Sequence, residues 1–326
     1  PLNYSTDTTT FGQIQCGGQN NKKFKTVVES GRYCNIYVDR AQGAGNNTNF
    51  SMNGTLIVGC DYDRYIENGN SNLQIFSKIT SRRNKSKNSA LDANSPIYDI
   101  YIKSGMIGID CFEKYDEAAY SGIYLSGNSG EAATDYDVGE RRLTIEGGKT
   151  ANITGGLKAY SSDKDSTSTR IYIKGNDASV QNIVGGCVKV KTSSDRIIQV
   201  TGGTIEYSIF SGSNGKDTIK GDIGSLDGNT LVYVGGNAKI GGTNRLTING
   251  SDGGDSLYGL QYGCILGAGN GNSSVDTAGV VNSSHIIIDG NAKIENNVYG
   301  GGNFAGVSGN TQIDMYGGTV GGTVHG

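Results

Sequence analysis

The carboxyl-terminal half of the chain repeats one short pattern, and this repeat constrains the fold more than any other feature of the sequence. Each unit has a short stretch of alternating apolar residues, a Gly-Gly or Gly-Asn corner, a second short apolar stretch and a further glycine. Alternation with a period of two residues predicts strands and excludes helices for these units. Glycine or asparagine at the corner supplies the positive φ of a sharp bend. The first apolar stretches begin at Leu143, Ile171, Ile197, Leu231, Ile286 and Ile313.

The spacing of the units predicts a solenoid. They recur every 26 to 34 residues, apart from a step of 55 residues after Leu231, where we expect one degenerate further turn near Leu246 or Tyr262. A single unit cannot bury its apolar face alone, so successive units must stack. Three short strands and three corners take about 20 to 30 residues, which predicts an all-β, three-sided parallel β-helix of about ten to twelve coils with loop insertions. A β-propeller, the alternative, would need four strands in ~40 to 50 residues and tight hairpins.

The first 140 residues follow a similar but less regular rhythm. We expect one domain over residues 1–326, with irregular coils and loop insertions in residues 1–140 and regular glycine-rich coils in residues 141–326. Pro1 is not an initiator methionine, and the final stretch GGTVGGTVHG looks like a cut through the repeat, so we expect a fragment of a longer chain. The weaker strand patterns begin at Asn35, Thr55, Leu73, Tyr98 and Gly122.

The charge of the chain disfavours nucleic acid as a partner. Lysine and arginine number 28 against 31 aspartates and glutamates, for a net charge of -3, so no global field would attract a polyanion. No window approaches the ~18 uninterrupted apolar residues of a membrane-spanning helix. The basic run Lys78–Lys87 is a local exception: Arg82 and Arg83 are candidates for binding an anionic glycan, and a solvated loop is the alternative interpretation.

Six cysteines lie far apart and never form a C-x-x-C pair. This spacing disfavours zinc, but it leaves open both buried free thiols and disulfides. Cys187 and Cys264 each follow glycine in an apolar stretch, which favours buried thiols there.

The units resemble the right-handed parallel β-helices of the pectin-lyase-like superfamily. The phrases GGTV, GGNAKI and VYGGGN are similar to those of large repetitive surface proteins of Gram-positive, often gut-dwelling, bacteria. The resemblance covers residues 143–326 clearly and the earlier residues loosely. It implies a right-handed coil and a location outside the cell, on a bacterial surface. Because these phrases are structural, the resemblance says little about function.

Many members of that superfamily cleave polysaccharides, so an enzyme is one alternative. The Asn-Thr-Asp, Asp-Asp, Gly-His-Gly and Arg-Ile-Lys segments expected of its galacturonase-type branch are absent from this sequence. A lyase of this fold would use calcium and a basic residue, for which the best local set is Asp61, Asp63 and Arg64 in CDYDR. His285 precedes an inward Ile286 and is therefore expected on the outer face of a strand.

Calcium is the only cofactor that the sequence suggests. The segments GSNGKDTIK and GSDGGDSLY approximate the nonapeptide of calcium-binding β-rolls, with Asp217 and Asp255 as ligands. Such rolls need tandem nonapeptides, whereas these two stand 38 residues apart. An ordinary glycine-rich corner is the alternative, and no cofactor is expected if that alternative holds.

Tyrosine is abundant throughout the chain, with 19 copies and no tryptophan, so a general role on the surface of the solenoid is one interpretation of its tyrosines. Tyr115 and Tyr120 lie in an acidic segment, DCFEKYDEAAYSG, which has the composition of a short helix or lid, and they could stack on sugars. The sequence favours a non-enzymatic module that displays a surface for a host or polymeric glycan or a surface protein. A polysaccharide lyase or glycoside hydrolase and a passive stalk are the alternatives.

Overall fold

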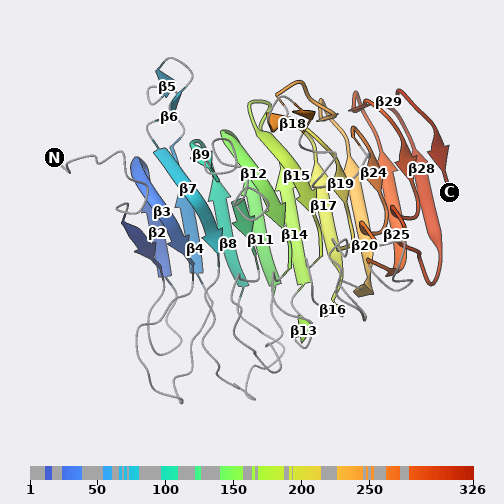
Figure 1. The fold of residues 1–326 in the computed structure, drawn as a ribbon, viewed down its shortest axis with the longest axis horizontal. Coiled ribbons are helices and arrows are strands. Elements are labelled where there is room, and N and C mark those ends of the chain that lie inside the picture. Colours follow the sequence, from blue (N-terminus) through green and yellow to red (C-terminus); the bar gives the residue numbers. More distant parts are fainter. Residues whose placement is uncertain are drawn as a thin grey trace.

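The computed structural model describes residues 12–16, 24–38, 54–60, 66–67, 70–71, 73–80, 97–108, 122–125, 140–156, 164–165, 168–186, 191–192, 194–213, 226–244, 247–248, 251–252, 262–271 and 279–326. Within these residues every regular element is a β-strand. The strands form two long parallel sheets, and in each sheet successive strands are stacked along the long axis of the molecule. The first and the last described strands lie at opposite ends of the stack (Figure 1). The all-β prediction with stacked parallel strands is confirmed.

One sheet, called sheet B here, has long rungs. Its stacking order follows the order of the chain along the molecule, as Figure 1 shows from blue to red. Its main strands are β2 (Phe24–Val28), β4 (Gly54–Val58), β8 (Ile97–Ile102), β11 (Glu140–Ile145), β14 (Ser168–Ile173), β17 (Arg196–Val200), β20 (Leu226–Val234), β25 (Val281–Ile288) and β28 (Thr311–Met315). Two short strands, β13 (Lys164–Asp165) and β16 (Lys191–Thr192), extend it beside β20.

The other sheet, called sheet A, is continuous in its first half, apart from one rung that is made of two short strands, and is divided throughout its second half. The continuous part contains β1 (Gln13–Gln15), β3 (Gly31–Tyr37), β7 (Leu73–Thr80), β9 (Met106–Ile107), β10 (Gly122–Tyr124), β12 (Lys149–Thr154) and β15 (Ser179–Val184). After β15 the pairing divides into two tracks of two-residue strands. One track is β18 (Thr204–Ile205), β21 (Lys239–Ile240), β26 (Lys293–Ile294) and β29 (Thr319–Val320), and the other is β19 (Ile209–Phe210), β24 (Ile265–Leu266), β27 (Val298–Tyr299) and β30 (Val324–His325).

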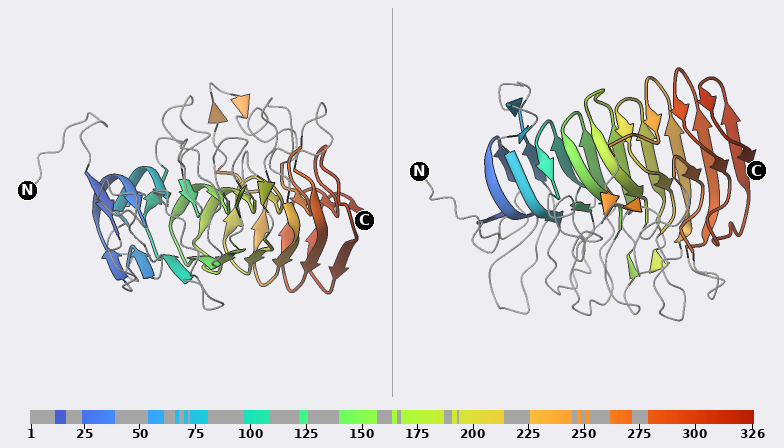
Figure 2. Two further views of the ribbon diagram at one scale, coloured as in Figure 1. Left: turned by 90° about the horizontal axis from the view of Figure 1, so that it is seen from below. Right: turned by 45° about the horizontal axis from the view of Figure 1, so that its top comes forward.

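Three strand tracks therefore run along the carboxyl-terminal half: sheet B and the two tracks of sheet A. Two small antiparallel hairpins, β5 (Ile66–Glu67) with β6 (Asn70–Ser71) and β22 (Thr247–Ile248) with β23 (Ser251–Asp252), lie outside these tracks. Figure 2 shows the same stack from two further sides, with the strands of neighbouring turns parallel to one another.

The apolar side chains of sheet B stack in register, as the repeat predicts. The residues in one inward row are fully buried or nearly so, because each branched aliphatic side chain covers the one on the neighbouring strand. The strands at the amino-terminal end, for which the pattern is weaker, join the same row. The row consists of Leu56, Ile100, Leu143, Ile171, Ile198, Val232 and Ile286.

Two of the expected unit starts are displaced by one residue. Ile171 pairs with Ile198, and Ile198 pairs with Val232, so Ile197 and Leu231 are on the outer face and not in the core. Each of these strands has adjacent apolar residues at this point, and alternation alone does not say which of the two faces inward. Tertiary stacking selects Ile198 and Val232.

The expectation of a hidden turn in the 55-residue step is wrong. Val232 pairs directly with Ile286, so a single turn of the chain separates them. The stretch around Tyr262 leads into β24, the third strand of that same turn, and the stretch after Leu246 forms the β22–β23 hairpin. The extra length is an insertion between β21 and β24.

The glycines of the first corner are required by backbone conformation. Gly148 and Gly203, each just before a strand of sheet A, have φ values of 84° and 71°, in the left-handed region that favours glycine. A Cβ on Gly203 would also lie 2.5 Å from the carbonyl oxygen of Ala178 on the previous turn. The Gly-Gly phrases thus serve stacking. None of the residues that the structure describes forms a helix of the length and apolarity that crossing a membrane requires.

Candidate functional site

The candidate residues from the sequence all lie outside the described residues. This holds for the possible catalytic set, the two arginines of the basic run, the two tyrosines of the acidic segment and the two calcium candidates. Among the described residues, no group of three or more histidine, cysteine, aspartate or glutamate side chains is arranged to hold a metal ion. The residues in question are Asp61, Asp63, Arg64, Arg82, Arg83, Tyr115, Tyr120, Asp217 and Asp255.

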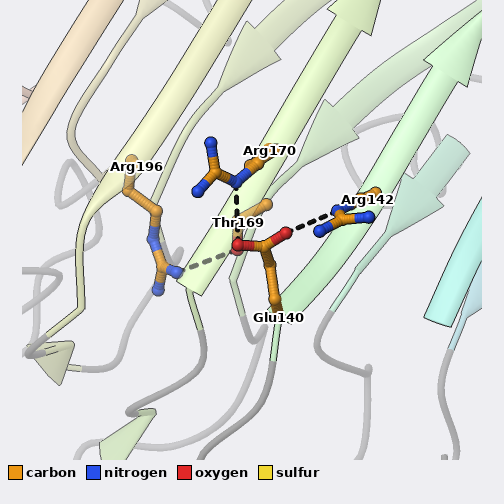
Figure 3. Close-up of polar contacts among 5 residues, drawn as sticks. All are labelled: Glu140, Arg142, Thr169, Arg170 and Arg196. Carbon is orange, nitrogen blue, oxygen red and sulfur yellow. Dashed lines mark hydrogen bonds and ion pairs between the residues drawn. The ribbon is translucent and has the colours of Figure 1, made fainter. Parts of the chain in front are cut away.

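A different group of polar side chains gathers on the outer face of sheet B. Glu140, at the start of β11, accepts hydrogen bonds from Nε of Arg142 on the same strand (2.5 Å) and Nε of Arg170 on β14 (2.8 Å). Figure 3 shows the carboxylate between the two guanidinium groups. The parallel register sets Arg142 directly opposite Arg170, so one carboxylate reaches both. About 40% of each arginine side chain remains exposed, 40% for Arg142 and 38% for Arg170.

The protonation states of this cluster are those of a fixed ion network. Burial alone would raise the pKa of Glu140, but hydrogen bonds and charge from Arg170 and Arg142 outweigh it and lower that pKa. The hydrogen bond to Glu140 raises the pKa of both arginines. Asp99, opposite Arg142 on β8, has a raised pKa because of its burial, against the favourable charge of Arg142. These shifts favour the charged forms of Glu140 and of both arginines.

A buried arginine lies behind this cluster on the inner side of sheet B. Arg196 is 1% exposed, and its Nη1 donates to Oγ1 of Thr169 at 2.8 Å (Figure 3). The Thr169 hydroxyl in turn donates to the carbonyl oxygen of Gly155, 3.0 Å away at the corner that follows β12. Arg196 therefore belongs to the packing of the corner, whereas Arg142 and Arg170 face solvent.

Two residues beyond the register position of Arg142 and Arg170, every second strand of sheet B carries a tyrosine. Tyr101, Tyr172 and Tyr233 occupy the same register position on β8, β14 and β20, with Thr144 and Gln199 on the strands between them. We call these five residues the tyrosine row. Tyr172 and Tyr233 are partly exposed, as a residue on the open face of a sheet should be. The row runs along the long axis of the molecule, across the strands.

His285 lies on the outer face of β25, as expected. Its Nε2 is 2.8 Å from Oδ2 of Asp314 on β28, which also accepts a hydrogen bond from Gln312. The pair lies on the outer face of sheet B, on its last two strands. Since its partner is a neighbouring strand residue, His285 serves the stacking of β25 on β28.

The outer face of sheet B was not among the predicted sites, although its signal is present in the sequence. The segments ERRLTI and STRIYI differ by one repeat length, and each carries an arginine one position before its inward aliphatic residue. Aligning all units by their inward residues would have placed Arg142 beside Arg170 and the tyrosines in one row. The one-residue displacement at Ile197 and Leu231 breaks that alignment.

No protein family model matches the chain, and comparison with curated proteins and with solved structures likewise gives no match.

Proposed function

We propose that this chain is a non-enzymatic module of a bacterial surface protein that binds a polymeric glycan outside the cell, along the outer face of sheet B. The resemblance of its repeats to pectin-lyase-like β-helices supports this location and a right-handed, three-sided coil. The hand of the coil and the number of ten to twelve coils stay predictions.

The observation that carries the proposal is the composition of one uninterrupted outer face. From β8 to β20, aromatic side chains run in one row and an arginine–glutamate network lies directly beside it. Tyrosine offers an apolar ring face with a polar tip, and arginine and glutamate offer donors and acceptors, which together suit the alternating C–H and hydroxyl surfaces of sugars. A passive stalk would need neither.

The chemistry of this face favours binding over cleavage. A lyase needs a base that can take a proton, and the arginines here hold their protons more firmly than usual because they bind Glu140. A hydrolase needs a carboxyl group protonated at neutral pH. The pKa of Glu140 is lowered, and Asp99, whose pKa is raised by burial, has the opposing charge of Arg142 beside it.

The proposal is tested by incubating the protein with a panel of insoluble and immobilised polysaccharides, neutral and acidic, with and without calcium. Bound protein is measured, and the supernatant is analysed by mass spectrometry for shortened sugars. We expect retention on at least one polysaccharide and no products. The variant Arg142→Ala/Arg170→Ala should be retained less, while Lys239→Ala on sheet A should behave as the unmodified protein.

The other outcomes are equally informative. Shortened products would overturn the proposal in favour of a lyase or hydrolase and direct attention to Asp61, Asp63 and Arg64. Absence of retention on every polysaccharide would favour the passive stalk.

A further inference from the structure

The tyrosine row has a regular spacing along the molecule. Its three tyrosines lie on every second strand, with the short Thr144 and the flexible Gln199 between them. Neighbouring strands are about 4.8 Å apart, so successive tyrosines are about 9.6 Å apart and the whole row spans about 19 Å. Tyrosine favours strands in general, but stacking does not require it on alternate rungs of one outer row.

The ring of Tyr233 lies along its strand rather than standing away from the sheet. A Cβ on Gly235 would lie 2.6 Å from the ring of Tyr233, so this ring covers Gly235, which is buried despite its position on the outer face. The hydroxyl of Tyr233 bonds to Oδ2 of Asp289 at 3.1 Å and holds the ring there. Tyr172 contacts a cation on each side along the chain: Nζ of Lys174 is 5.2 Å from its ring centroid, and its side chain hydrogen-bonds to that of Arg170.

Between Tyr101 and Tyr172, the row is formed by Thr144, which adds little to the exposed surface. It lies between Tyr101 and Tyr172 and is only 7% exposed, although it belongs to the outer face. Partly exposed tyrosines thus alternate with the buried Thr144 and the partly exposed Gln199. A ligand that touches the rings must bridge these positions.

The row itself carries no charge. From Ile57 on β4 through the tyrosine row to Ile287 on β25, every residue at this register position is uncharged. In the neighbouring cluster, Asp99 and Glu140 balance the charges of Arg142 and Arg170. Of the charged groups that contact the rings, Lys174 at Tyr172 and Asp289 at Tyr233 are opposite in sign. A ligand without net charge therefore suits the row better than an acidic one.

We infer that the tyrosine row takes one extended, uncharged β-1,4-linked polysaccharide chain, which lies along the long axis of the molecule and advances by one disaccharide from each tyrosine to the next. This rests on the proposed function and gives it a substrate class. A β-1,4-linked chain is a flat ribbon in which the sugar orientation repeats every second ring, and its disaccharide length is close to two strand spacings. An α-1,4-linked glucan curls away from a straight row of rings.

The test is isothermal titration of the full chain with uncharged oligosaccharides. Cellohexaose, mannohexaose and xylohexaose are β-1,4-linked probes, maltohexaose is the α-linked control and a hexamer of galacturonic acid is the acidic control. At least one β-1,4-linked hexaose should bind, and more tightly than both controls. For that sugar, affinity should rise up to about five rings, the length that covers the row, and then level off.

Two variants connect binding to the row. Tyr172→Ala, at its centre, should weaken binding about tenfold, whereas Tyr37→Ala, on the outer face of sheet A, should have no effect. Gly235→Ala displaces the ring of Tyr233 without removing it and should shorten the sugar length at which affinity levels off. Circular dichroism shows whether each variant keeps its fold. If Tyr172→Ala unfolds, Tyr172→Leu takes its place.

The results separate this inference from the proposed function. If the protein is retained on polysaccharides, three results would overturn the inference and leave the proposed function standing. They are no binding of the β-1,4-linked hexaoses, tighter binding of the acidic hexamer, and equal effects of Tyr172→Ala and Tyr37→Ala. Absence of retention on every polysaccharide would overturn both.

Discussion

Sheet B and the second half of sheet A are made by the same turns of the chain, but only sheet B keeps unbroken strands there. The strands β17, β20, β25 and β28 have five to nine residues, while their counterparts in the two tracks of sheet A have two each. Sheet A divides at Glu206–Ser208, beside the insertion that leaves after β21 and returns before β24. The comparison shows that sheet B keeps its pairing along these turns while sheet A divides into two tracks.

Glu206 explains how the division is tolerated. Its side chain is 1% exposed, and a buried carboxylate is costly unless it is hydrogen-bonded. Oε1 accepts a hydrogen bond from Ser179 at 2.7 Å, and Oε2 accepts one from the backbone N–H of Asn244 at 3.0 Å. Glu206 therefore fastens the start of the insertion to the previous turns.

The largest effect is expected from a charge in the core of sheet B. Ile198→Asp buries an unpaired carboxylate and should cost about 4 kcal/mol or more in the free energy of unfolding. Ile197→Asp, one residue earlier but on the outer face, should cost less than about 1 kcal/mol. Urea unfolding followed by circular dichroism measures both, and equal losses would contradict the register of sheet B.

A smaller and more local effect is expected at the division of sheet A. Glu206→Ala removes the acceptor for Ser179 and Asn244 and should cost about 2 kcal/mol. Hydrogen exchange at the Asn244 amide should accelerate much more than exchange in β17. Glu206→Gln keeps one carbonyl acceptor and should cost less. Unchanged protection of Asn244 in the alanine variant would show that Glu206 does not hold the insertion.

On the outer face of sheet B, the Glu140 network should contribute less than about 1 kcal/mol, because its arginines are well exposed. Since the folded protein lowers the pKa of Glu140 from its ordinary value of 4.5, the contribution is present above that value and is lost as the pH falls through the lowered pKa. The stability difference between the unmodified protein and Glu140→Gln should therefore shrink from pH 7 to pH 3 in urea titrations. Glu146→Gln, at an exposed position after the same strand, is the control, and a gap that widens in acid would contradict the assignment.

The smallest effect concerns a thiol where the insertion returns to sheet A. Cys264 is a buried free thiol whose pKa is raised by burial. Alkylation by iodoacetamide should be slow at pH 8 compared with the half-buried Cys60, as measured by peptide mass spectrometry. Glu206→Ala should accelerate labelling of Cys264 if the insertion and β24 open together. Rapid labelling of Cys264 in the unmodified protein would show that the reagent reaches this thiol without opening of β24.

Much of the stack was predictable from residue pattern. Leu143, Ile171, Ile286 and Ile313 were identified as unit starts and stack as expected, and the weaker patterns at Thr55, Leu73 and Tyr98 form β4, β7 and β8. In each case alternating apolar residues next to a glycine corner admit only one inward face. His285 was likewise expected outside the core, because Ile286 is inward.

The rest depended on contacts between turns. IIQV and LVYV each offer two adjacent aliphatic residues, and only pairing with the neighbouring strand decides that Ile198 and Val232 face inward. The same one-residue choice determines that Tyr233 shares a row with Tyr172 and Tyr101. The Glu140 network needs side chains from two turns, 30 residues apart, which local pattern does not connect.

The sequence by itself determined that this chain is a stack of parallel strands with glycine corners, because period-two alternation and corner glycines act within a few residues. Only the tertiary structure decided which residues line the outer face of sheet B and that the long step contains one turn with an insertion. These outcomes depend on register between turns, and register follows from how side chains about 27 residues apart pack against one another.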